Sequence, residues 1–184
     1  MSTTIILVIV ALLVAFYVFS IYNKFVRKRS MMEEGLSGID VQLKKRYNLI
    51  PSLVETVKGY AKHEQETLQQ VITARNSALA ADGVKAQTSA ENQLNSALAN
   101  VFALSEAYPD LKANTNFLQL QKELSAIEGD VEKARRYYNA TVRENNIMVE
   151  SFPSNFIANS FSFYAREYFE IEDAGERSMP EVKF

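Results

Sequence analysis

An unbroken apolar run opens the chain. No charged residue occurs from Thr3 to Tyr22, which reads TTIILVIVALLVAFYVFSIY. As a helix these residues would span roughly 30 Å, the hydrocarbon thickness of a bilayer. The run is apolar on every side, unlike a soluble helix with one buried face. A cleaved signal peptide would need a basic start, a shorter apolar run and a small-residue cleavage site. The pattern therefore predicts one membrane-spanning anchor.

Basic residues flank only one end of this run. None precedes it, and four follow it: Lys24, Arg27, Lys28 and Arg29. Lys and Arg remain on the cytoplasmic side, which predicts an outside N-terminus and cytoplasmic residues 24–184. Two interpretations of the four cations remain. They only end the translocated segment, or they also bind anionic lipid headgroups, with a favourable free energy of about 1 kcal/mol for each cation.

Beyond the anchor, apolar residues recur at spacings of three and four. This pattern is typical of coiled-coil-like helices packed at shallow crossing angles. Arg46 occupies a position in the first stripe where an apolar residue is expected. The stripes are Met32–Leu36–Ile39–Leu43–Ile50, Ile50–Val54–Val57–Ala61–Leu68–Val71–Leu79, Leu94–Leu98–Val101–Leu104–Tyr108 and Phe117–Leu120–Leu124–Ile127–Val131–Ala134–Tyr138.

Helix-breaking and capping residues separate these stripes. Pro51 suits the first turn of a helix, and Asp82-Gly83 suits a helix end. Thr88 with Glu91 has capping-box spacing, and Asn114 or Thr115 follows as a further cap. The expected helices cover about 4–47, 51–81, 88–107 and 113–151. Short connections make neighbours antiparallel. The predicted fold is all-α: an N-terminal transmembrane helix followed by an antiparallel up-down-up-down four-helix bundle.

Three regions follow from this pattern: an anchor at 1–23, a bundle at 24–151 and a tail at 152–184. Pro153 stops the last helix, and the tail is dense in Phe and Tyr before it turns acidic. A dangling aromatic tail would expose a large apolar patch. We expect it to pack on its own bundle, on a second copy or on the membrane surface.

The amino-acid composition excludes several kinds of chemistry and ligand. The chain has no Cys, which excludes thiol chemistry and disulfides. Its 20 basic and 22 acidic residues give a net charge of −2, which supplies no general attraction for nucleic acid. Four Pro and six Gly are few for a β-rich fold.

The only histidine stands in an incomplete metal motif. A zinc protease needs HExxH, whereas His63 opens HEQET, with Thr67 in the second histidine's place. A carboxylate-bridged metal site would need ExxH on two helices. The sequence also has no glycine-rich phosphate loop and no GxSxG elbow. We expect no catalysis, metal or cofactor, and keep as an alternative an enzyme or accessory factor that uses His63 and Glu64.

The remaining polar residues have a structural interpretation. Asp40 and Lys44 have the spacing of an ion pair on one helix, worth about 0.3–0.5 kcal/mol. Other polar residues are expected to form hydrogen bonds and ion pairs between helices, which fix register, or to bind a partner. These are Arg46, Glu55, His63, Glu64, Arg75, Asn139 and Asn145.

Three segments of the chain resemble one family. IDVQLKKRYNLIPSLVETVKGYAKHEQETLQQVITAR, YNATVRENNIMVESFPSNFIA and EYFEIEDAGERSMPEVKF, with YNKFV after the anchor, resemble the LemA family of bacterial membrane proteins. The resemblance covers nearly the whole chain. It implies an anchored four-helix domain in the cytoplasm, a role in membrane organisation or envelope quality control, and no agreed catalytic residues.

These observations leave three functional hypotheses, in this order. The first is a scaffold of the bacterial inner membrane that binds another protein or itself as a homo-oligomer. The second is a self-assembling protein that remodels or binds lipid. The third is the enzyme or accessory factor already mentioned.

Overall fold

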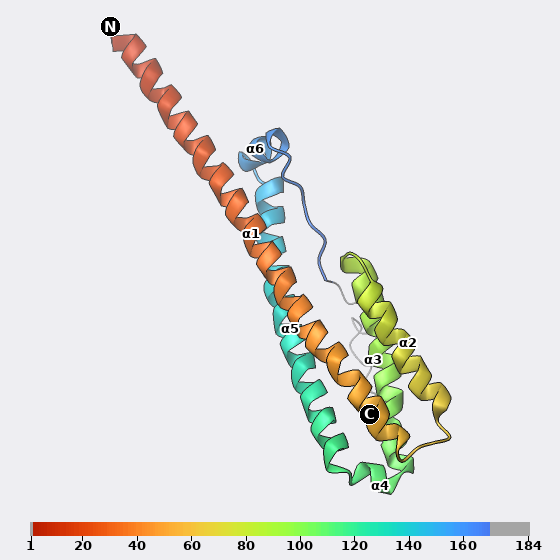
Figure 1. Cartoon of the computed structure of the whole chain (residues 1–184). Helices are drawn as coiled ribbons and strands as arrows, with labels where there is room; N and C mark the ends of the chain where they lie inside the picture. The colour runs from red at the N-terminus through yellow and green to blue at the C-terminus, as the bar shows by residue number, and fades with distance from the viewer. Residues whose placement is uncertain (1, 170–184) are drawn as a thin grey trace, which may run out of the picture. The chain divides into compact units, whose positions relative to one another are not determined.

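The structure is a computed structural model that describes residues 2–169. In that range the chain forms helices and turns and contains no strand, which confirms the all-α class with an apolar N-terminal helix (Figure 1). The helices are α1 (Ser2–Lys58), α2 (Gln65–Ala80), α3 (Val84–Ala107), α4 (Pro109–Lys112), α5 (Thr115–Glu150) and α6 (Ser154–Ser160).

The chain divides into two compact units. Unit 1 joins Met1–Gly38 to Ala134–Tyr168, and unit 2 is built around Ile39–Lys133. Unit 1 therefore holds the first part of α1, the last part of α5, and α6. Unit 2 holds the rest of α1 and α5, together with α2, α3 and α4.

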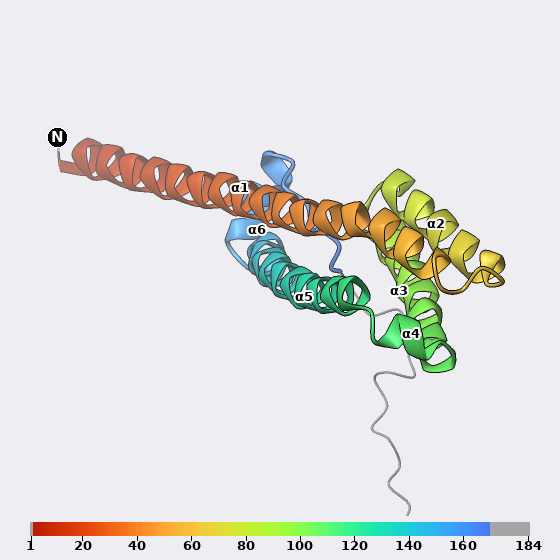
Figure 2. The ribbon, with the colours of Figure 1, turned by 60° about the horizontal axis from the view of Figure 1, so that its bottom comes forward.

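Four helical segments of unit 2 run in alternating directions along the chain, and α4 lies at the connection before α5 (Figure 1, Figure 2). Each segment buries most of its apolar stripe, as the spacing of three and four predicts. Leu79, which the sequence placed in the second stripe, is an exception and is 52% exposed. The fully buried side chains include Ile50, Leu53, Val57, Val71, Leu94, Val101, Leu111 and Phe117.

The first turn between helices lies later than the sequence suggested. We expected a break at Asn48–Pro51, but α1 continues through Pro51 to Lys58, and the turn follows at residues 59–64. Proline has no N–H, so the carbonyl of the residue four positions earlier loses its helical donor. That carbonyl belongs to Tyr47, and the Nε of Arg75 on α2 donates to it at 2.8 Å. A donor from another helix thus replaces the missing bond, and the expected boundary is wrong.

This replacement predicts a coupling between Pro51 and Arg75. Arg75→Met leaves the Tyr47 carbonyl without its donor and is expected to cost about 1–3 kcal/mol. Pro51→Ala restores a helical N–H for the same carbonyl, so Arg75→Met costs less in that background. Urea unfolding of the native chain, both single variants and the double variant measures the coupling energy. Strictly additive costs would show that the two residues act independently.

The second helix boundary also differs from expectation. α3 begins at Val84 after Gly83, whose φ is +83°, a conformation that favours glycine. The Thr88 hydroxyl donates to the Val84 carbonyl at 2.8 Å, one turn inside the helix. The expected capping box of Thr88 and Glu91 is therefore wrong. Asn114, in contrast, does cap α5, since its Oδ1 accepts the Phe117 N–H at 2.9 Å.

In unit 1 the helices α1 and α5 approach closely at Gly35. A Cβ atom on Gly35 would lie 3.2 Å from the Tyr138 Cα and 3.3 Å from its Cβ. The ion pair between Lys28 and Glu144 joins the same two helices, and it lowers the pKa of the Glu144 carboxyl. Glycine at position 35 is therefore required by packing rather than by backbone conformation.

Two glycines of α1 are expected to respond oppositely to alanine. Gly38 has nothing within 4 Å of its would-be Cβ, so Gly38→Ala should stabilise the chain by about 0.5–1 kcal/mol through helix propensity alone. Gly35→Ala places a Cβ atom against the backbone of α5, so α5 must move away from α1, and the chain should lose about 1–2 kcal/mol of stability. Thermal unfolding of the full chain in detergent measures both. Equal shifts of the same sign would contradict the close approach.

The tail after α5 returns along unit 1. Asn145 donates to the Tyr164 carbonyl at 3.1 Å, and Asn146 exchanges two hydrogen bonds with the backbone of Arg166 at 2.8 and 2.9 Å. The Tyr138 hydroxyl donates to the Glu167 carbonyl at 3.1 Å. This part of the tail packs on the chain's own helices. The acidic segment that ends the tail lies outside the described residues.

Within the described residues, α1 alone is long and apolar enough to cross a membrane. Only 6% of its most apolar 18-residue window is buried within the protein, whereas a core helix would be mostly covered. Its large apolar side chains face outward, Leu12 being 65% exposed and Phe16 75% exposed. The first part of α1 therefore has the surface of a membrane-spanning helix.

Candidate functional site

Unit 2 contains a group of polar side chains that we call the polar cluster: Arg46, Tyr47, Gln87, Glu91, Asn95 and Glu128. Arg46, Tyr47 and Glu91 are buried, and the other three are partly exposed. The Arg46 Nη1 donates to Glu91 Oε2 at 2.9 Å, and its Nη2 bonds the Asn95 side-chain oxygen. The same Nη2 forms an ion pair with Glu128 Oε2 at 2.9 Å. The cluster thus ties α1 to α3 and α5.

Glu91 is the centre of the polar cluster. Its side chain is fully buried, and both carboxylate oxygens have partners. Oε2 accepts from Arg46, and Oε1 accepts from the Tyr47 hydroxyl. The Gln87 amide in turn donates to the Tyr47 hydroxyl oxygen at 2.9 Å. A buried carboxylate is tolerated only with such a complete set of partners.

The polar cluster keeps Tyr47 protonated. Burial, followed by the hydrogen bond to Glu91, raises the pKa of the Tyr47 hydroxyl far above its ordinary value. The hydroxyl therefore remains a donor to Glu91 throughout the physiological range. The chemistry of the cluster suits a fixed connection between helices.

Tyr47→Phe removes one of the donors to Glu91 and should cost about 1–3 kcal/mol at neutral pH. Because the pKa of Tyr47 is raised in the folded chain, its contribution is complete below the ordinary tyrosine pKa of about 10 and is lost at higher pH. The difference between native chain and variant should therefore shrink as the pH rises above about 10. Urea unfolding at a series of alkaline pH values measures this.

Tyr60→Phe is the matched control, since the Tyr60 hydroxyl accepts only an exposed hydrogen bond from Asn114, at 2.8 Å. We expect a change within about 0.5 kcal/mol. A Tyr47→Phe cost that is small, or that grows with pH, would contradict the assignment.

A groove of about 400 Å³ opens beside the polar cluster. It lies between α3 and α5, and Leu98, Phe102 and Leu124 supply its apolar lining. Arg46 reaches its wall already neutralised by two carboxylates, which leaves little attraction for an anion. Within residues 2–169, no three His, Asp or Glu side chains gather where they could hold a metal ion.

Several residues singled out from the sequence make contacts between segments. Arg46 lies in the polar cluster, Arg75 bonds the Tyr47 carbonyl, and Asn145 holds the tail. The Glu64 carboxylate accepts from the Tyr108 hydroxyl at 3.0 Å, which raises the pKa of Tyr108.

Three further candidates, Glu55, His63 and Asp40, are exposed. Glu55 is exposed and pairs at 3.8 Å with Lys58 on its own helix. His63 lies exposed in the turn between α1 and α2. Asp40 lies on the exposed side of α1, where partial desolvation by its neighbours raises the pKa of its carboxyl. No ion pair joins Asp40 to Lys44 in the described part of the chain. Asn139 lies within α5, and Pro153 directly precedes α6.

Five members of the polar cluster were not predicted from the sequence as contacts between helices: Tyr47, Gln87, Glu91, Asn95 and Glu128. A signal existed for Glu91, because it stands three residues before Leu94 and seven before Leu98, in phase with the third apolar stripe. A charged residue in an apolar stripe, facing Arg46 in another, indicates a buried ion pair.

Fold and site together define a class: an all-helical, membrane-associated protein, with one apolar helix suited to a bilayer and a helical unit locked by buried polar bonds. The chain belongs to the LemA family, whose model matches residues 35–184.

Relatives in three bacteria share this similarity. Protein LemA of Metamycoplasma hominis is 25% identical over 152 residues, which cover 82% of this chain and 69% of the relative. Magnetosome protein MamQ 2 of Paramagnetospirillum magneticum is 23% identical, and MamQ of Magnetospirillum gryphiswaldense 22%, each over 84% of this chain and 66% of the relative. The chain thus spans about two thirds of the length of these proteins. None of their names suggests catalysis.

Proposed function

We propose that this protein is a membrane-tethered helical scaffold without catalytic activity. In this proposal α1 holds it in the inner membrane of a bacterium, with the N-terminus outside, and unit 2 binds another protein in the cytoplasm. The arrangement of the basic residues after the apolar run supports this orientation.

The observation that carries the proposal is an exposed groove of about 680 Å³ where α1 turns into α2. Apolar residues of its lining, Val54, Leu68 and Ile72, are accompanied by the charged residues Glu55 and Lys58. Protein interfaces have this composition, an apolar centre with a polar rim. Glu55 and Lys58 at the groove are exposed and pair with each other at 3.8 Å, which supports a docking surface with a solvated rim.

Site-specific cross-linking tests the groove. The chain has no Cys, so Gln69→Cys on the groove carries the only thiol for a photoactivatable cross-linker. Lys122→Cys, exposed on α5 outside the groove, is the matched control. In native membranes we expect a discrete adduct at position 69 and none at position 122. No adduct, or the same adducts at both positions, would refute the docking groove.

Thiol labelling tests the orientation separately. A membrane-impermeant maleimide should label Ser2→Cys on intact cells, and should label Lys122→Cys only after the cells are permeabilised. The reverse pattern would place unit 2 outside the cytoplasm.

Self-assembly on the membrane is the second candidate function. It is supported by the exposed cations Lys24, Arg27 and Arg29 after the apolar run, which suit anionic lipid headgroups. The mass of the adduct at position 69 separates the candidates. Twice the chain mass indicates a second copy, and any other mass indicates a different protein.

A further inference from the structure

We propose that residues 151–164 of unit 1, which we call the aromatic cap, insert aromatic side chains into the lipid bilayer at its headgroup boundary. The aromatic cap comprises α6 and the turns on either side of it. The protein would then contact the membrane in two ways, through the spanning part of α1 and through the shallowly inserted rings of the aromatic cap. The inference rests on α1 being a membrane anchor.

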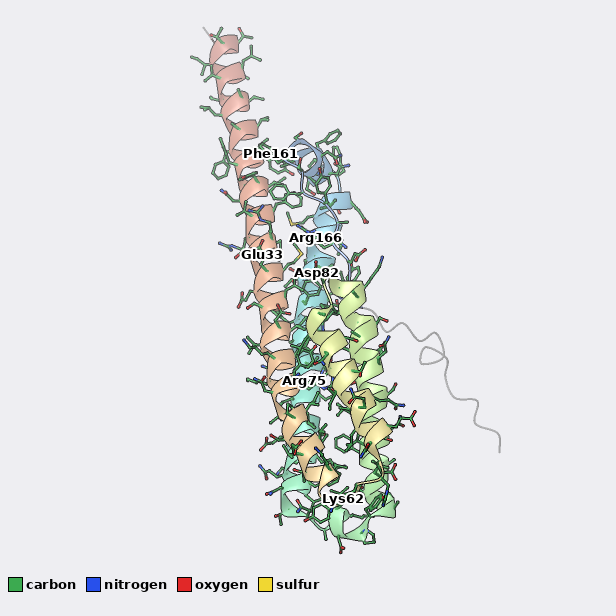
Figure 3. All side chains as sticks on the ribbon, turned by 45° about the vertical axis from the view of Figure 1, so that its right-hand side comes forward. Glu33, Lys62, Arg75, Asp82, Phe161 and Arg166 are labelled. Carbon is green, nitrogen blue, oxygen red and sulfur yellow. The ribbon has the colours of Figure 1, made fainter. Side chains whose placement is uncertain are left out.

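The aromatic cap packs on α1 near the end of the uncharged run. Ile157 and Ala158 of α6 form one buried cluster with Ile21 and Phe25 of α1, and Val18 packs against its edge. Figure 3 shows Phe161 beside α1, and the chain continues from there without regular structure toward Arg166.

Contacts between aromatic rings also place the aromatic cap beside residues 22–25 of α1. The Phe161 ring centroid lies 5.0 Å from that of Tyr22, and the rings of Phe163 and Phe25 stack at 4.7 Å. Tyr22 ends the apolar run, and Asn23 alone separates it from Lys24, the first cation. If α1 spans a bilayer with this run, the aromatic cap lies where hydrocarbon meets headgroups.

The outer face of the aromatic cap carries large exposed rings. Phe152 is 79% exposed, Phe156 64% and Phe161 51%. The rings of Phe152 and Phe156 touch edge to face at 5.9 Å, so they form one exposed pair. Aromatic side chains are enriched at membrane interfaces, and an apolar patch of this kind marks an interaction surface.

Charge changes at both ends of this segment. No charged residue occurs from Ser151 to Ala165, while Glu150 precedes the stretch and Arg166 follows it. The first charged residue after the stretch, Arg166, is also the residue whose backbone hydrogen-bonds the Asn146 side chain on α5. The uncharged part is therefore the part that lies level with the end of the apolar run.

Lipid is the occupant that this surface fits, because the surface adjoins that of the anchor. Phe16 and Phe19 of α1, 75% and 66% exposed, belong to the uncharged run that ends at the level of the aromatic cap. A surface that an apolar helix already exposes to hydrocarbon needs no protein partner to cover it. Shallow burial of rings by about 5–10 Å into the headgroup boundary is typical of interfacial helices.

Tryptophan fluorescence measures this contact directly, because the chain has no Trp. We would place single tryptophans as Phe156→Trp, with Phe152→Trp as a second probe, in the full chain in phosphatidylcholine vesicles. Vesicles without bromine are compared with vesicles whose lipid is brominated near the start of the acyl chain and with vesicles whose lipid is brominated deep in the chain. Tyr137→Trp, exposed on α5 about 20 Å along the helix from its end, is the control that should face water. Phe16→Trp reports on the anchor.

Emission from Phe156→Trp and Phe152→Trp is expected to fall about twofold in the brominated vesicles, as burial at the headgroup boundary requires, while that of Tyr137→Trp is unchanged. Unquenched, water-like emission from both cap probes would overturn the inference. So would blue-shifted emission without quenching, which would indicate a protein over the patch. If Phe16→Trp is quenched by deeply brominated lipid and the cap probes are not, only the inference fails. If Phe16→Trp is also unquenched, the anchor fails with it.

Discussion

Glu91→Ala is expected to lower the free energy of unfolding by about 3–5 kcal/mol, because it leaves the charge of Arg46 buried without its main partner. The Tyr47 hydroxyl also loses its acceptor. Urea unfolding of the full chain in detergent, followed by circular dichroism, measures the loss as a shift of the midpoint.

Glu55→Ala is the matched control, since Glu55 lies on an exposed face of unit 2 and its pair with Lys58 is solvated. Its effect should stay within about 0.5 kcal/mol. Arg46→Ala combined with Glu91→Ala should cost less than the sum of the single changes, because neither buried charge of the pair then remains without its partner, and Glu128, which also loses Arg46, is 46% exposed to water. Equal effects of Glu91→Ala and Glu55→Ala would refute a buried lock at Glu91.

Two lysines in the middle of the apolar run should release the chain from the membrane. Leu12→Lys with Leu13→Lys opposes insertion by about 5–7 kcal/mol, at about 2.5–3.5 kcal/mol for each charge near the centre of a bilayer. Carbonate extraction of cell membranes measures the share of the chain that remains in the pellet, and we expect a large decrease.

The control places the same two charges on exposed leucines of unit 2. Leu79 is 52% exposed and Leu118 48%, and neither belongs to the apolar run. Leu79→Lys with Leu118→Lys should leave the chain in the membrane pellet. If the Leu12 and Leu13 variant also stays there at the native level, the apolar run is not the anchor.

The sequence was sufficient for features that depend on local pattern alone. The uncharged run, the helical stripes and the Asn114 cap all follow from residue order and spacing, and the structure agrees with them. The anomaly at Arg46 was also visible, as a charge in an apolar stripe.

What the sequence could not supply was the identity of partners far along the chain. Pro51 breaks a helix unless another donor reaches the Tyr47 carbonyl, and that donor is Arg75 on a different helix. The spacing of Thr88 and Glu91 fits a capping box as well as it fits the interior of a helix. Only the placement of Arg46 and Tyr47 opposite Glu91 decides that its carboxylate turns inward.

The bond from Arg75 to the Tyr47 carbonyl has a consequence for how this region opens. The Tyr47 carbonyl of α1 accepts its hydrogen bond from Arg75 on α2, because Pro51 cannot donate to it. If either segment detaches, this backbone carbonyl is left without a hydrogen bond from the protein. We therefore expect amide protons of Leu53–Val57 and of Leu68–Ala78 to exchange with solvent in one cooperative event, with the same opening free energy.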